Sequence, residues 1–283
     1  MDRFHNPDIS VTVMRRQVGD LLMDGLFWYG RLMDAQNWHG VWGGAFPSGT
    51  ACRSAVYRLR KQGLLVGELT GRFAQLALTD EGKRRLKRLH QPERMWRREW
   101  GGYWYMFMYD VPESSRHYRD VLRGFLKKQR LGCLQKSIYI TPNDIRPDFA
   151  DLREAIEVDQ YAYLFESRTV LGLDPMAVVR DAWNWRAING AHAWFIDKFQ
   201  KKLIEVEHDL LDTPALQTLA REEMGAYVTV MDGDPLLPEP LLPQEYVGGV
   251  VLNLHRSITK AVAGKLKFPR KRRDPPIAAR SDT

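Results

Sequence analysis

The sequence predicts a mixed α+β protein built from several parts, and three observations lead to that prediction. Apolar residues recur at three- and four-residue intervals near the N-terminus and again in the last third of the chain, which is the period of an amphipathic helix. The middle of the chain instead holds near-continuous or alternating apolar runs that stop at proline, as strands do. A length of 283 residues fits two or three domains rather than one.

The composition is that of an ordinary globular protein, with 44% hydrophobic and 27% charged residues. No stretch approaches the ~20 uninterrupted apolar residues that a membrane-spanning helix needs, and the first ten residues are too polar for a signal peptide. Two cysteines, Cys52 and Cys133, are too few for a disulfide framework and lack the spacing of a zinc site. We therefore expect a cytoplasmic protein with no membrane partner.

Three helices are predicted in the first module, which we expect to span residues 13–79. Apolar residues at helical spacing predict a first helix over 18–27 and a second, shorter helix over 28–38. The third helix lies in the stretch TACRSAVYRLRKQGLL and begins near a candidate capping residue, either Ser48 or Thr50.

A hairpin follows the third helix. Gly63 stands where a helix normally ends in a left-handed residue. Two short strands are expected at 64–68 and 73–78, around the turn Thr70-Gly71-Arg72. Three helices and a hairpin in this order predict a winged helix-turn-helix, in which the third helix enters the major groove of DNA.

The third helix carries basic side chains on its predicted exposed side, since Ala55, Val56 and Leu59 share the apolar face. The net charge of +7 also favours contact with a polyanion. Arginine, lysine and hydroxyl groups on the helix can bind base edges and phosphates of DNA, and the arginine of the hairpin tip can reach a neighbouring minor groove. We predict double-stranded DNA as the partner, bound by Thr50, Arg53, Ser54, Tyr57, Arg58, Arg60, Lys61 and Arg72. The alternative is a helical bundle whose basic helix is merely solvated.

A charged linker is expected at residues 80–100, which hold eight basic and four acidic side chains. Leu86 and Leu89 give it a weak apolar side, and Pro92 interrupts it. We expect a short linker helix whose basic side chains either touch the DNA backbone or stay solvated.

The central module, residues 101–172, is predicted to be a ferredoxin-like dimerisation domain. The apolar run 103–112 predicts a buried strand, and CLQKSIYITP predicts another. A helix lies between them, and a second helix (149–158) precedes short strands at 161–166 and 168–171. Strand, helix, strand, helix, strand is the split βαβ order. Four tyrosines suit a homodimer interface: Tyr103, Tyr105, Tyr161 and Tyr163.

Asp110 ends the first strand of this module, where a carboxylate could hold a metal ion and position water for phosphodiester hydrolysis. Only Glu113 lies nearby in the sequence, and Asp110 could equally cap the following helix. We therefore expect no enzyme, with no catalytic residue, metal or cofactor. A metal-dependent nuclease acting through Asp110 is the alternative function, and an interaction module of a larger complex is a third.

The region 173–265 is predicted to be helical and to sense a ligand. Flat aromatic rings there suit an aryl or adenine group, and flanking arginines suit a phosphate or carboxylate. The candidate ligand-binding residues are Arg180, Trp183, Arg186 and Trp194. The tryptophans could instead fill the core of a helix bundle. The tail 266–283 is basic and poor in apolar residues, so we expect it to be disordered.

Four stretches resemble the PaaX family of bacterial transcriptional regulators, which repress phenylacetate degradation. They are RSAVYRLRKQGLL (53–65) with LTDEG, WYMFMYDVP (104–112), LGCLQKSIYITP (131–142) and DPLLPEPLLP (234–243). The central module also looks like the nuclease subunit of CRISPR spacer acquisition. The resemblance implies a homodimeric, nucleoid-associated repressor that binds a palindromic operator and is released by an effector of the aryl-acetyl coenzyme A (CoA) thioester type.

Overall fold

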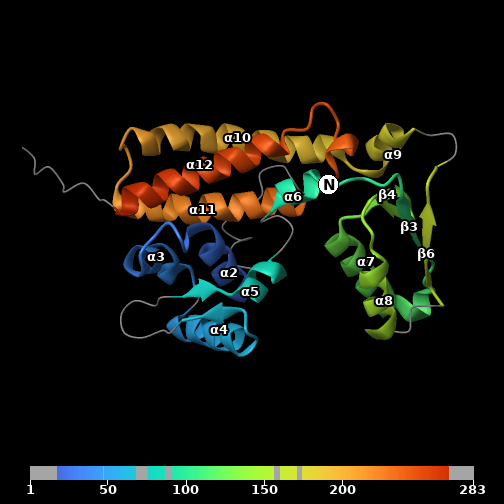
Figure 1. Ribbon diagram of the computed structural model, residues 1–283, viewed down its shortest axis with the longest axis horizontal. Helices are drawn as coiled ribbons and strands as arrows, with labels where there is room; N and C mark the ends of the chain where they lie inside the picture. Colours follow the sequence, from blue (N-terminus) through green and yellow to red (C-terminus); the bar gives the residue numbers. More distant parts are fainter. Residues whose placement is uncertain are drawn as a thin grey trace, which may run out of the picture. The chain divides into compact units, whose positions relative to one another are not determined.

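A computed structural model gives the fold and describes residues 18–46, 48–67, 76–86, 91–155, 160–170 and 174–267. Helices combine with two antiparallel sheets, so the protein belongs to the α+β class, as predicted (Figure 1). The described residues form two compact units. The sheet unit contains Leu86–Phe199 and Gly225–Leu254. The N-terminal unit contains the residues up to Arg85, Gln200–Met224 and the residues from His255 onwards.

The N-terminal unit begins with three helices and a small antiparallel sheet. These elements are α2 (Val18–Tyr29), α3 (Ala35–Trp42), the 3-10 helix η1 (Gly43–Ala45), α4 (Gly49–Lys61), β1 (Leu65–Val66), β2 (Ala77–Leu78) and α5 (Asp80–Arg85). Helix α2 packs against both α3 and α4. The buried rings of Tyr29 and Trp42 meet edge to face with centroids 5.6 Å apart, which joins α2 to α3.

The second helix lies later in the chain than predicted. Residues 28 and 29 still belong to α2, and α3 begins only after Asp34. The Asp34 carboxylate accepts a hydrogen bond from the Asn37 N–H at 2.8 Å and so caps the first turn. The prediction was wrong because it followed the tryptophan spacing, whereas the cap sets where this helix starts.

The ends of α4 agree with the sequence pattern. Ser48, one of the two candidate caps, accepts a hydrogen bond from the Ala51 N–H at 3.1 Å. Gly63 has a φ of 71°, which confirms the left-handed residue predicted after the helix. Of the two predicted strands, the described residues show β1 at Leu65–Val66 and β2 at Ala77–Leu78, with residues 64, 67 and 76 outside these strands. Residues 68 and 73–75, and the predicted turn at 70–72, lie outside the described residues.

The sheet unit contains a four-stranded antiparallel sheet in the order β4-β5-β3-β6. Its elements in chain order are β3 (Trp104–Tyr109), η3 (Glu113–Ser115), α7 (Arg116–Gln129), β4 (Gly132–Gln135), β5 (Ile138–Thr141), α8 (Arg146–Ala155) and β6 (Ala162–Ser167). In Figure 1, α7 and α8 lie on the same side of this sheet. The chain thus alternates strands and helices in the order βαββαβ.

Both faces of the sheet bury apolar side chains, because successive residues of β3 point to opposite sides. Tyr105 and Phe107 pack with Leu122 and Phe125 of α7. On the other face, Trp104 lies in a cluster with residues of α9 (Pro175–Ala182). Central strand β3 is therefore covered on two sides, as the near-continuous apolar run predicted.

Two strand predictions in this unit were wrong. The run CLQKSIYITP forms two strands, because Lys136 and Ser137 make a turn between β4 and β5. The predicted strand at 168–171 is absent over 168–170, where Ser167 Oγ donates instead to the Thr169 carbonyl at 2.7 Å. Of the predicted helix 149–158, the first seven residues lie in α8, and 156–159 lie outside the described residues.

The remaining helices are α6 (Pro92–Trp96), α10 (Trp185–Glu207), α11 (Thr213–Asp232), η4 (Glu239–Leu241) and α12 (Gly248–Lys267). The predicted linker helix is thus two short helices, α5 and α6. The three long helices contribute residues to both units. Within the described part of the chain, no helix is long and apolar enough to cross a membrane.

A buried aspartate organises the turn between α11 and η4 in the sheet unit. The Asp234 carboxylate is fully buried and accepts hydrogen bonds from the Leu236 N–H and the Tyr246 hydroxyl, both at 2.7 Å. Nε2 of His192 lies 3.1 Å from the same carboxylate. Arg130 donates to the carbonyls of Met231 and Asp234. This turn therefore depends on side chains from α10, from the end of α7 and from the segment before α12.

Candidate nucleic-acid interface

The exposed side of α4 collects most of the predicted DNA-binding residues. Ala55, Val56 and Leu59 are buried, so the helix is anchored by one apolar face. Tyr57 is 69% exposed, which leaves a large aromatic side chain in solvent. Seven predicted residues are exposed on this helix: Thr50, Arg53, Ser54, Tyr57, Arg58, Arg60 and Lys61. The eighth, Arg72, lies outside the described residues.

The basic side chains of α4 have no carboxylate to neutralise them within the described residues: no ion pair there involves Arg53, Arg58, Arg60 or Lys61. Arg53 instead donates from Nη2 to Oγ1 of Thr50 at 3.1 Å, which orients its guanidinium group along the first turn. The other three lie in the last turn, where the helix dipole favours positive charge. All four charges therefore remain available to a polyanion.

Thr79 fixes the turn that follows α4. Its hydroxyl donates to the Gly63 carbonyl at 2.6 Å and accepts from the Gly82 N–H at 2.9 Å, while its own N–H donates to the Leu64 carbonyl at 3.0 Å. Gly82 packs so closely that a Cβ there would lie 2.2 Å from the Leu64 oxygen. Through these contacts the sequence LTDEG connects the end of α4 to the start of α5.

The basic residues of α5 are arranged differently, because each has an acidic partner one turn away. Lys83 pairs with Asp80 at 2.8 Å, and Arg84 and Arg85 pair with Glu81 at 2.8 and 3.0 Å. The hydrogen bond from Lys83 holds the pKa of Asp80 below its usual value, and the hydrogen bonds from the two arginines lower the pKa of Glu81 in the same way. The positive charge of α5 is therefore largely compensated within the helix.

A buried carboxylate–histidine pair supports α2 within the N-terminal unit. Glu223 of α11 and His255 of α12 are fully buried, with His255 Nδ1 2.8 Å from Glu223 Oε1. Trp28 of α2 meets the His255 ring edge to face at 4.3 Å between centroids. Burial raises the pKa of Glu223, and His255 opposes that shift. No sequence signal reveals this cluster, since the two partners are 32 residues apart.

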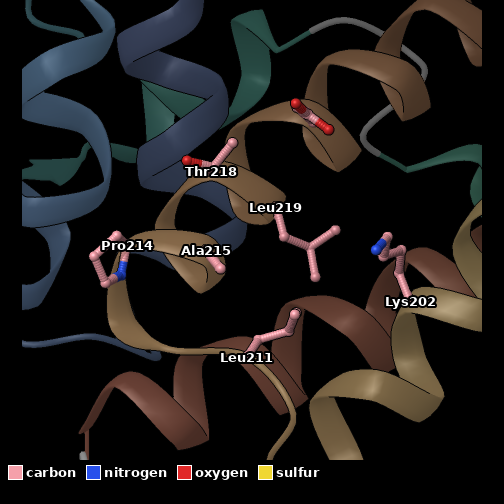
Figure 2. Close-up of a pocket in the computed structure, with 7 residues that line it drawn as sticks. Lys202, Leu211, Pro214, Ala215, Thr218 and Leu219 are labelled. Atoms are coloured by element: carbon pink, nitrogen blue, oxygen red, sulfur yellow. The ribbon is translucent and has the colours of Figure 1, made fainter.

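The four predicted ligand-binding residues lie in different environments. Trp183 is 9% exposed, belongs to the core under the sheet, and donates from Nε1 to the Arg130 carbonyl at 3.3 Å. Trp194 is half-buried, with the Lys198 ammonium 5.4 Å from its ring centroid. Arg180 and Arg186 are exposed. A cavity of about 350 Å³ lies elsewhere, between α10 and α11, and none of the four lines it (Figure 2).

Asp110 lies at the exposed end of β3, where its N–H donates to the Tyr161 carbonyl at 2.8 Å. The nearest acid along the chain, Glu113, is paired with Arg119 at 2.9 Å. Across the residues that the structure describes, no group of three or more His, Cys, Asp or Glu side chains is arranged to hold a metal ion. Nothing in this geometry supports the nuclease alternative.

Comparison with known proteins identifies the family. The sequence profile described as the PaaX protein central Cas2-like domain matches residues 97–179, and that of the PaaX-like protein C-terminal domain matches residues 183–267. The chain belongs to the PaaX family. The transcriptional repressor PaaX of Escherichia coli (strain K12) is 27% identical over 219 aligned residues, and the match covers 75% of this chain and 68% of that protein.

A solved structure also resembles this PaaX-family chain. The uncharacterized protein Rv0674 from Mycobacterium tuberculosis has a TM-score of 0.50 and 20% sequence identity, covering 83% of this chain and 90% of its own. That similarity concerns the fold alone. The two PaaX profiles cover the four-stranded sheet, Asp234 and all of α10, α11 and α12, whereas α4 precedes both. The case for α4 as an interface therefore rests on its own geometry.

Proposed function

We propose that this PaaX-family chain is a homodimeric transcriptional repressor that binds double-stranded operator DNA through α4. The observation that carries the proposal is the exposed face of α4, where four basic side chains have no acidic partner within the described residues. The name of the E. coli relative, a transcriptional repressor, supports the same function. A binding protein of this kind needs no catalytic residue.

We propose a winged helix-turn-helix as the DNA-binding module. Helices α2, α3 and α4 followed by the β1–β2 pair have the required order. In that arrangement α4 is the recognition helix, and Arg53 near its start is the side chain best placed for a guanine edge. Arg58, Arg60 and Lys61 then hold phosphates.

We propose that the sheet unit contains a ferredoxin-like domain through which two copies associate. The βαββαβ order and the strand order β4-β5-β3-β6 support that domain type. Of the four tyrosines predicted for the interface, Tyr105 is buried, Tyr103 and Tyr161 pack against the same core, and Tyr163 is 58% exposed. Tyr163 lies on edge strand β6 and is therefore the tyrosine that can meet a second copy.

An aryl-acetyl-CoA thioester is the proposed effector, on the strength of the family resemblance. The exposed Arg180 and Arg186 suit the phosphates of such a ligand. An effector releases DNA only if it binds better to the conformation that does not bind DNA, and linkage requires DNA to weaken effector binding by the same factor. Titration of phenylacetyl-CoA against the DNA complex tests this part separately.

The experiment that tests the DNA-binding proposal is selection of duplexes from a randomised pool by the full-length protein. We expect enrichment of a two-fold symmetric motif, because a symmetric dimer reads two half-sites. Selection repeated in the presence of Mg²⁺ should return intact DNA. A pool without sequence enrichment would overturn the proposal, and Mg²⁺-dependent cleavage lost in Asp110→Asn would replace it with the nuclease.

A further inference from the structure

The cavity between α10 and α11 lies wholly within the N-terminal unit and has a volume of about 350 Å³. Figure 2 shows Lys202 of α10, Leu211 of the connecting segment and Leu219 of α11 directed toward the same space. Its lining residues are Lys202, Leu211, Pro214, Ala215, Thr218, Leu219 and Glu222. Such a volume is near the lower end of the ~300–1,000 Å³ of small-molecule sites, so it suits a ligand much smaller than a CoA thioester.

The lining combines aliphatic groups with one side chain of each charge. Lys202 pairs with Glu205 at 2.7 Å, which uses one of its three N–H donors and leaves two. Glu222 is exposed and forms no ion pair within the described residues. None of the lining residues is aromatic. The cavity therefore offers N–H donors of Lys202 to a carboxylate and the Glu222 carboxylate to an ammonium group. Its leucine side chains can contact an aliphatic group.

We propose that this cavity binds a free α-amino acid with a branched aliphatic side chain. Lys202 binds the ligand carboxylate, Glu222 binds its ammonium group, and Leu211 and Leu219 contact its side chain. A ligand without a carboxylate leaves Lys202 paired with Glu205 alone, and a ligand without an ammonium group makes no ion pair with Glu222. Either ligand loses one charge-assisted hydrogen bond, which lowers its affinity. The site is separate from the arginines proposed for the CoA effector.

The wall of the cavity is also the support of α3. Arg221 donates from Nη2 to Oγ1 of Thr218 at 3.1 Å and from Nη1 to the Val41 carbonyl at 2.7 Å, in the last turn of α3. One turn earlier, Gln217 packs so closely on Gly40 that a Cβ there would lie 2.8 Å from its Nε2. A ligand that binds more tightly to one position of residues 217–221 of α11 therefore shifts the position of α3, the helix that precedes α4. This regulatory step rests on the proposed function, whereas binding itself does not.

Calorimetric titration of the full-length protein with L-leucine, 4-methylpentanoate and 3-methylbutylamine tests the site. The last two compounds are leucine without its ammonium group and without its carboxylate. We expect L-leucine to bind about tenfold more tightly than either, the factor that one charge-assisted hydrogen bond supplies. In Lys202→Met, leucine and 3-methylbutylamine should bind with the same affinity, because the variant has no partner for the leucine carboxylate. In Glu222→Gln, leucine and 4-methylpentanoate should bind with the same affinity, because the variant has no carboxylate for the leucine ammonium group. Absence of leucine binding at millimolar concentration, or equal binding of all three by the wild type, would overturn the proposal.

Two alanine variants separate filling of the cavity from general damage to the fold. Ala215→Leu places a larger side chain in the cavity and should weaken leucine binding by about tenfold or more. Ala187→Leu makes the same change at a half-buried alanine of α10 outside the cavity and should leave binding unchanged. Equal losses in the two variants, with equal melting temperatures, would contradict the assignment of the ligand to this cavity.

The regulatory step is read from the affinity of the protein for its selected DNA duplex with and without L-leucine. We expect leucine to change that affinity in the wild type, and Arg221→Gln to abolish the change while keeping leucine binding within about twofold. DNA binding without leucine binding overturns the site and leaves the repressor function intact. Leucine binding without any selected duplex overturns the repressor function and leaves the site intact. Leucine binding with no effect on DNA affinity overturns the coupling through Arg221.

Discussion

Helices α4 and α5 both belong to the N-terminal unit, and both are rich in arginine and lysine, yet their electrostatic environments are opposite. In α5 every basic side chain has a carboxylate partner one turn away, whereas the basic residues of α4 have none within the described residues. A count of basic residues would rank the two helices alike. On the proposed function, we expect compensation of charge, rather than its amount, to distinguish the DNA-binding surface of α4 from the solvated surface of α5.

The largest expected effect is on sequence recognition by α4. Arg53→Ala should weaken binding to the selected duplex by ~1–3 kcal/mol and flatten its sequence preference, since a bidentate contact to a base edge is lost. Competition between the selected duplex and a scrambled one, followed by fluorescence anisotropy, measures both quantities. Wild-type selectivity in this variant would show that α4 does not read bases through Arg53.

The next effect concerns the stability of α4 itself. Ser48→Ala removes the hydroxyl that accepts from the Ala51 N–H, and loss of such a cap costs roughly 0.5–2 kcal/mol. Urea denaturation of the full chain should show that loss. Thr50→Ala serves as the matched control, because Thr50 is not the cap and its removal should affect DNA selectivity through Arg53 rather than stability.

A smaller effect is expected from the phosphate-binding end of α4. Arg60→Ala should weaken selected and scrambled duplexes alike and reduce the slope of log affinity against log salt by roughly one. Lys83→Ala in α5 is the matched control, and its slope should stay close to that of the wild type because Asp80 pairs with that lysine alone. Equal changes in both variants would remove the distinction between the helices.

The smallest effect is expected from a variant in which α5, like α4, carries arginines without a carboxylate partner. Glu81→Gln releases Arg84 and Arg85, so the affinity for scrambled DNA should rise at low salt, with a slight loss of thermal stability. The pKa of Glu81 is lowered by its partners, so its ion pairs contribute above its usual pKa, and the contribution disappears as pH falls through the lowered value. Melting temperatures of variant and wild type should therefore converge in acid. A difference that persists there would show that Glu81 acts through packing.

Local patterns in the sequence predicted α4 well, because its apolar face, its cap and Gly63 are all determined by neighbouring residues. The start of α3 was wrong because Asp34 was not recognised as a cap. The division of CLQKSIYITP into two strands was missed because the turn Lys136-Ser137 offers only the weak signal of a serine, without glycine, asparagine or proline. The compensation in α5 was visible as acids three and four residues before bases, but it was not used.

Contacts between distant parts of the chain were beyond reach of the sequence. Glu223 and His255 form a buried pair only because α11 and α12 bring them together under α2. The same holds for Arg221, whose bond to the Val41 carbonyl spans 180 residues. The ligand prediction relied on aromatic density, and Trp183 instead fills the core under the sheet, where an indole ring buries much apolar area.

The Asp234 turn bears on how members of this family can be compared. The carboxylate of Asp234 contacts Leu236, Tyr246 and His192 of the same chain. The motif DPLLPEPLLP therefore stabilises the turn between α11 and η4. A stretch with that role contributes to the fold, and its contacts do not by themselves indicate what this protein responds to. Two regulators could share it letter for letter and answer to unrelated metabolites, so a classification by effector would need the ligand-binding residues proposed above, on α9, α10 and α11.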